Sequence, residues 1–125
     1  MGIPSDGWLK LSSRYKRGAR DLITDVPGIL VGHRTVDDPS RDIHTGVTAI
    51  VPADGDVFRE KIPAGVAVIN GFGKSAGLLQ VEELGTIETP IMLTNTFGVG
   101  TGINALTKYM LERHPEIGVS VGTVT

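Results

Sequence analysis

The sequence predicts an α+β fold of the layered α/β type, and three observations support this. Short apolar runs rich in β-branched residues recur along the chain, as in "HTGVTAIVP", "AGVAVIN" and "TPIMLTN". Two glycine-rich turns, "NGFGKSAG" and "FGVGTG", each lead from such a run into helical apolar spacing. The 17 glycines stand beside short runs of Val, Ile and Ala, which indicates closely packed strands rather than flexible linkers.

The first half of the chain predicts a polar arm followed by strands. Residues 1–20 are polar, and residues 21–125 form the predicted domain. We expect a turn at Pro27-Gly28, a strand over 29–31 and a polar loop over 37–42. The next run alternates, with Val47, Ala49 and Val51 on one face, until Pro52 ends it.

The second half predicts strands that alternate with helices. Residues 64–70 are apolar nearly throughout, as in a strand that is covered on both faces. A helix is expected from an N-cap at Ser75 to a stop at Gly85, burying Leu78, Val81 and Leu84. We then expect a strand over 89–95, a helix over 103–114 that buries Ile103, Leu106 and Met110, and a strand over 117–125. A terminal strand needs sheet neighbours, so we expect the N-terminal portion of something larger, or half of an assembly.

Composition excludes several classes of protein. The 125 residues carry a net charge of −2, with 12 basic against 14 acidic side chains, so no electrostatic footprint for nucleic acid or an anionic membrane exists. Cysteine is absent, which excludes disulfides, thiolate metal sites and cysteine nucleophiles. No apolar run has signal-peptide character or approaches the ~20 residues of a membrane span. We expect a soluble, cytoplasmic protein.

The stretch "GFGKS" resembles part of a phosphate-binding loop. That motif needs a glycine five positions before Gly73, where this sequence has Val68. A dinucleotide fingerprint is closer, because Gly71, Gly73 and Ala76 have the required spacing. The acidic residue that should end the following strand is missing, since that strand ends at Asn95. A small nucleotide-binding module built on the Gly71–Ala76 turn therefore remains an alternative.

Polar residues at the tips of the two strand-to-helix turns are the candidate functional residues. Asn70, Asn95 and Thr96 either cap helices or face a polar cleft in which a substrate docks. The three histidines are scattered at positions 33, 44 and 114, without the local spacing of a metal site. We expect neither a metal nor a cofactor. No serine stands in a nucleophile elbow.

Four segments together carry a family resemblance: "LITDVPGILVGHRT", "HTGVTAIVP", "INGFGKSAGLLQVEELG" and "PIMLTNTFGVGTG". In this order and spacing, from about Asp21 onward, the sequence resembles the DmpA-like family of L-aminopeptidase/D-esterases and β-peptidyl aminopeptidases. The resemblance implies an αββα sandwich of the N-terminal-nucleophile-hydrolase type. It also implies that the glycine turns serve packing and cleft architecture rather than phosphate binding.

The resemblance further implies a self-processing enzyme. The family precursor cuts itself at a Gly-Ser bond, and the new N-terminal Ser attacks short peptides, amides or esters that have a free amino end. The family's catalytic residues all correspond to positions downstream of Thr125, so no catalytic residue is assigned in this chain. We expect an inactive fragment whose partner is the remainder of its precursor, in an oligomer of processed heterodimers. Besides the nucleotide-binding module, a catalytically empty scaffold or interaction protein remains an alternative.

Overall fold

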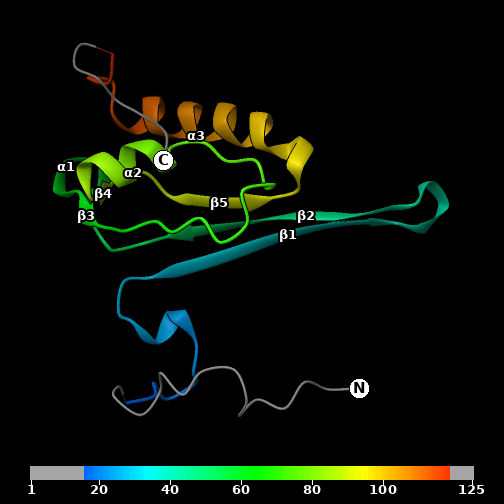
Figure 1. Cartoon of the computed structure of the whole chain (residues 1–125), viewed down its shortest axis with the longest axis horizontal. Coiled ribbons are helices and arrows are strands. Elements are labelled where there is room, and N and C mark those ends of the chain that lie inside the picture. Colours follow the sequence, from blue (N-terminus) through cyan, green and yellow to red (C-terminus); the bar gives the residue numbers. More distant parts are fainter. Residues whose placement is uncertain (1–15, 119–125) are drawn as a thin grey trace.

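A computed structural model describes residues 16–118. Its main sheet has three antiparallel strands in the order β1-β2-β5: β1 (Leu30–Asp38), β2 (Ile43–Val51) and β5 (Ile91–Thr94). β1 and β2 pair over their full length, from Leu30 opposite Val51 to Asp38 opposite Ile43. β5 pairs only with residues 47–50 of β2. The distal half of the β1–β2 hairpin therefore projects beyond β5 as a two-stranded ribbon (Figure 1).

The hairpin turn is built by local hydrogen bonds. The 3-10 helix η3 (Pro39–Arg41) connects the strands, and the Asp38 carboxylate accepts hydrogen bonds from the backbone N–H and the hydroxyl of Ser40. Asp42 then takes a left-handed conformation with φ of 53°, which Asp tolerates better than most residues. The predicted strand over 29–31 was too short, because every residue up to Asp38 finds a partner on β2.

Three helices accompany the sheet: α1 (Val57–Glu60), α2 (Leu78–Leu84) and α3 (Val99–Arg113). Helices α2 and α3 lie on the same side of the main sheet (Figure 1). Gly102 of α3 lies so close to β5 that a Cβ there would be 3.0 Å from Sδ of Met92. The small buried apolar core comes from these helices and consists of Val57, Val81, Leu106 and Met110. These observations confirm the predicted α+β fold class.

The fold contains a second sheet of two strands. It pairs β3 (Ile62–Pro63) with β4 (Thr86–Ile87) in antiparallel fashion. The Ala64 N–H extends the pairing by donating to the carbonyl of Gly85 at 2.8 Å. Gly85 ends α2 with φ of 67°, the left-handed conformation that glycine adopts without steric cost. The predicted helix stop at Gly85 is confirmed, whereas α1, β3 and β4 were not predicted.

Three sequence predictions differ from the structure. Residues 64–70 form no strand, and Ile69 is 99% exposed, because only Ala64, at the start of this run, continues the pairing of β3 with β4. Ser75 is not a helix cap, since α2 starts only at Leu78 after Gly77, which has φ of 82°. Of the expected α2 stripe only Val81 is buried, and the flanking Leu78 and Leu84 are exposed.

The last helix is longer than predicted at its start. The 3-10 turn η4 (Thr96–Gly98) runs directly into α3, which begins at Val99 rather than at residue 103. It ends at Arg113, one residue before the predicted end at His114, which is its C-cap. The burial of Leu106 and Met110 is confirmed, while Ile103 is half-buried. The predicted arm over 1–20 and strand over 117–125 fall largely outside the described residues.

Candidate functional site

The Asn95 side chain connects the end of β5 to the turn η4 and to strand β2. Its Oδ1 accepts a hydrogen bond from the Gly98 N–H at 2.9 Å, and so caps the turn η4. Its Nδ2 donates to Oγ1 of Thr45 in β2 at 2.7 Å. Thr96 follows as the exposed first residue of η4. Asn95 therefore acts as a cap, and both the oxygen and the nitrogen of its side-chain amide are engaged in hydrogen bonds.

Asn70 stabilises the glycine-rich turn. Its Oδ1 accepts from the Phe72 N–H at 3.0 Å, a local turn geometry typical of Asn. Lys74 donates to the Phe72 carbonyl at 3.0 Å, and its ammonium lies 5.0 Å from the centre of the Phe72 ring. Asn70 and Asn95 thus stabilise separate turns, and each has its own hydrogen-bond partners.

A nucleotide fingerprint also requires a strand before this turn and a helix that opens on it. Residues 64–70 are irregular, and α2 begins two residues after Ala76. Both observations weigh against nucleotide binding by the Gly71–Ala76 turn.

An apolar cavity of about 340 Å³ lies between α2, α3 and β5. Aliphatic side chains of all three elements line it, with Lys74, Ser75 and Thr94 as polar members. Asn70, Asn95 and Thr96 are not among its lining residues. The predicted cleft residues and the cavity are therefore distinct features of the fold.

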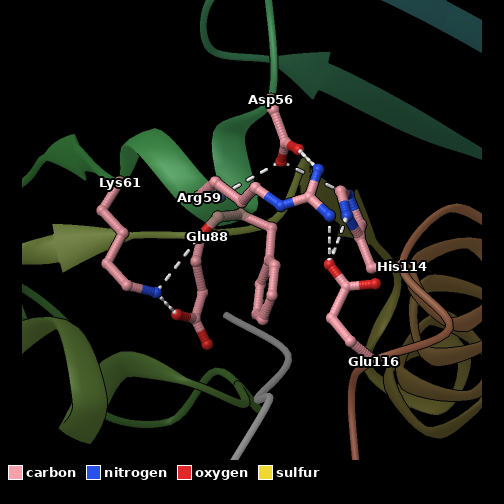
Figure 2. Close-up of polar contacts among 7 residues, drawn as sticks. Asp56, Arg59, Lys61, Glu88, His114 and Glu116 are labelled. Carbon is pink, nitrogen blue, oxygen red and sulfur yellow. Dashed lines mark hydrogen bonds and ion pairs between the residues drawn. The ribbon is translucent and has the colours of Figure 1, made fainter.

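A polar cluster joins α1 to the end of α3 (Figure 2). We call Asp56, Arg59, His114 and Glu116 the His114 cluster. The Arg59 guanidinium bridges the two carboxylates, with Nη1 at 2.7 Å from Asp56 Oδ2 and Nη2 at 2.5 Å from Glu116 Oε1. The His114 side chain is only 10% exposed, and it lies between the same two carboxylates, 3.5 Å from Asp56 Oδ1 and 3.7 Å from Glu116 Oε1.

This environment lowers the pKa of both carboxyl groups. For Asp56, burial opposes the change, but the Arg59 N–H and the charges of His114 and Arg59 outweigh it, so that the pKa falls. For Glu116, a hydrogen bond from its own backbone N–H is the largest cause, and the charges of Arg59 and His114 add to it. Both groups stay ionised at lower pH than free carboxylates.

A second ion pair flanks the His114 cluster across an aromatic ring. Lys61 pairs with Glu88, whose side chain is 6% exposed, and also donates to the Phe58 carbonyl at 3.1 Å. The Phe58 ring stands 4.9 Å from the Lys61 ammonium and 5.0 Å from the His114 ring. Side chains from three separate parts of the chain, at positions 56–61, 88 and 114–116, thereby lie close together (Figure 2).

Sequence reasoning missed this group of side chains. The sequence shows His114 only as one of three scattered histidines, because its partner Asp56 is more than 50 positions away. One local signal was available: Asp56 precedes Arg59 by three positions, and its carboxylate accepts from the Arg59 N–H at 3.1 Å as the N-cap of α1. The cluster has no metal-binding geometry, and no group of three metal-ligating side chains occurs within residues 16–118.

Comparison with known proteins identifies the family. The model of peptidase family S58 matches residues 21–125. The chain belongs to peptidase family S58. The DmpA-like resemblance seen in the sequence is thereby confirmed.

Two curated relatives are β-peptidyl aminopeptidases named BapA. The one from Sphingosinicella xenopeptidilytica is 37% identical over 123 residues, and the one from Sphingosinicella microcystinivorans is 31% identical over 119 residues. These matches cover 93% and 90% of this chain, but 28% of each relative. The chain thus spans little more than a quarter of the length of the relatives it matches.

Solved structures support the same assignment. The PH0078 protein from Pyrococcus horikoshii OT3 is 47% identical with a TM-score of 0.79, covering 89% of this chain and 33% of that one. A Burkholderia sp. β-aminopeptidase is 38% identical with a TM-score of 0.76, covering 87% of this chain and 31% of that one. Within residues 16–118, no helix is long and apolar enough to cross a membrane.

Proposed function

We propose that this chain is the N-terminal scaffold of a family S58 aminopeptidase. The complete enzyme cleaves short peptides, amides or esters that have a free amino end. The observation that carries the proposal is the family match over residues 21–125, together with curated relatives that are β-peptidyl aminopeptidases. The chain supplies sheet and helix architecture, and the reactive hydroxyl belongs to polypeptide that follows Thr125.

The side chains of the described residues support a scaffold role. A serine nucleophile needs a base within hydrogen-bond reach. The Ser40 hydroxyl is instead bound to the Asp38 carboxylate at 2.6 Å within the hairpin turn. No contact between a serine and a histidine is found in the part of the chain that the structure describes.

The proposed chemistry is that of an N-terminal nucleophile. The precursor cleaves itself before a serine, whose free amine then acts as the base for its own hydroxyl. Attack on the substrate carbonyl expels the leaving amine and forms an acyl-enzyme, which water hydrolyses. Asn70, Asn95 and Thr96 are proposed to border the substrate cleft through the turns that they stabilise.

Exposed apolar side chains support a further polypeptide as the partner. Ile69, Phe72, Leu79 and Phe97 are each more than four-fifths exposed. Large apolar side chains gathered at a surface mark interaction sites. We propose that they pack against the remainder of the precursor, within an oligomer of processed heterodimers.

Expression of two proteins tests the proposal: the 125-residue chain, and the same chain extended through its full reading frame. The extended protein should split into two fragments, visible by mass spectrometry, and should hydrolyse β- and α-aminoacyl p-nitroanilides. The 125-residue chain should release no p-nitroaniline.

Two results would refute this assignment. One is turnover by the 125-residue chain that is lost when one of its own residues, such as Ser75, is changed to Ala. The other is a reading frame that stops after Thr125 and yields no processed product, which favours the empty scaffold. Isothermal titration with ATP and NAD covers the nucleotide-binding alternative, because tight binding would favour it.

A further inference from the structure

His114 occupies a position in which one proton decides the charge balance of its surroundings. Asp56 and Glu116 bring two negative charges, and Arg59 brings one positive charge. With a neutral imidazole the His114 cluster carries one excess negative charge, and with a protonated imidazole it is balanced. Histidine is the side chain that exchanges its proton near neutral pH. The neighbouring Lys61–Glu88 ion pair lies on the other side of the Phe58 ring.

The geometry leaves the imidazole incompletely satisfied. Nδ1 of His114 is buried and has no hydrogen-bond partner, and its nearest carboxylate oxygen, on Glu116, is 3.7 Å away. Nε2 lies 3.5 Å from Asp56 Oδ1. A protonated imidazole has a donor on each nitrogen and faces an acceptor on each side. A neutral imidazole can donate to only one of the two carboxylates.

The two carboxylates belong to different parts of the fold. Asp56 is the N-cap of α1, whereas Glu116 lies in the turn through which the chain leaves α3. Two backbone hydrogen bonds stabilise that turn, from His114 N–H to Met110 O at 2.8 Å and from Ile117 N–H to His114 O at 3.0 Å. An imidazole that binds both carboxylates therefore connects α1 to the exit of α3.

We infer that His114 is a proton-operated latch. When it is protonated, it bridges Asp56 and Glu116 and holds the turn over residues 114–117 against α1. When it is neutral, the Glu116 carboxylate keeps its own backbone N–H and Arg59, which is 64% exposed, but loses the bridge to the imidazole, and the turn opens more often. At mildly acidic pH, the latch therefore holds the turn that follows α3 more firmly against α1. This inference does not depend on the proposed enzymatic activity.

Hydrogen exchange followed by mass spectrometry tests the latch on the 125-residue chain. The readout is the protection factor of the peptide over residues 111–118, corrected for intrinsic exchange, at pH 5.5 and at pH 8.0. We expect about 3- to 5-fold higher protection at pH 5.5, the size of effect that a partly exposed ion pair produces. The lowered pKa values of Asp56 and Glu116 keep both carboxylates ionised at either pH.

Matched variants separate the latch from general effects of pH. His114→Gln should abolish the difference between the two pH values. His44→Gln should preserve it, because His44 contacts Asp37 on the distant hairpin. If the His114→Gln chain does not fold, Glu116→Gln replaces it and should at least halve the ratio. Equal protection at both pH values in the unmodified chain, or an unchanged ratio in the folded variants at 114 or 116, would overturn the latch.

Discussion

Adding one methyl group at Gly46 should separate the two strands of the hairpin. Gly46 lies in β2 opposite Thr35 of β1. A Cβ built there would be 2.7 Å from the carbonyl oxygen of Arg34 and 3.3 Å from Cα of Thr35. Both are backbone atoms of the paired strand, so no side-chain rotation relieves the contact. Gly32 is the matched control, because it lies in β1 and a Cβ there meets nothing within 4 Å.

The expected free energies follow from these contacts. Forcing an extra carbon into a close-packed position costs roughly 1–3 kcal/mol. Replacing glycine by alanine inside a strand recovers about 0.5–1 kcal/mol, because the unfolded chain loses freedom. Gly46→Ala should therefore lower the free energy of unfolding by about 1–2 kcal/mol. Gly32→Ala should leave it unchanged or raise it by up to ~1 kcal/mol.

Urea denaturation followed by far-UV circular dichroism, at low micromolar concentration, measures both changes. At an unchanged slope, a shift of the midpoint reports stability directly. The Gly46→Ala chain should unfold at lower urea than the original, and the Gly32→Ala chain should not. If Gly46→Ala were as stable as Gly32→Ala, the strand register at residues 34–46 would be wrong.

Three further changes test other parts of the fold. Asn95→Ala should lower the free energy of unfolding by about 1 kcal/mol because it removes a helix cap. Asn95→Asp keeps the acceptor for the Gly98 N–H and should lower it less. Equal losses in urea melts would exclude the cap. Asp56 and Glu116 have lowered pKa values in the folded chain, so the stability they contribute is present above their unfolded pKa of about 4 and is lost as pH falls through the lower folded values. The double variant Asp56→Asn/Glu116→Gln should accordingly lose less stability between pH 5 and pH 3 than the original, and an identical slope would contradict the pKa assignment. Leu106→Ala should lower the free energy of unfolding by about 2–3 kcal/mol because Leu106 is 7% exposed. Leu111→Ala, on the exposed face of the same helix, should lower it by under ~1 kcal/mol. Similar urea midpoints for the two variants would place the core elsewhere.

Local signals in the sequence were sufficient for several elements. Strand β2 ends at Val51, directly before Pro52, and this stop can be read from neighbouring residues. Gly85 stops α2, and His114 directly follows the last residue of α3. Each of these signals acts within a few positions. Their accuracy therefore does not depend on the rest of the fold.

Features that depend on distant partners were not predictable in this way. The length of β1 follows from its pairing with β2, and residues 34–38, which are polar except for Val36, gave no sign of it. The His114 cluster joins residues from 56 to 116, and a single sequence holds no record of that proximity. Asn95 lies between these cases: its position predicted a cap, but its second bond to Thr45 required the sheet.

The disagreement at residues 64–70 is informative about the whole enzyme. The sequence there has the continuous apolar character of a strand covered on both faces, yet Val68 and Ile69 are 70% and 99% exposed. A strand forms only where a neighbour accepts its backbone hydrogen bonds. On the proposed function, that neighbour is polypeptide that the chain lacks, since it spans 28% of its curated relatives. Backbone amides of residues 66–69 should then exchange at least 10-fold more slowly in the extended protein than in the 125-residue chain, because formation of a strand protects them. Equal exchange in a correctly processed, active protein would show that this apolar run remains a loop, and the pairing argument would fail while the proposed activity remained.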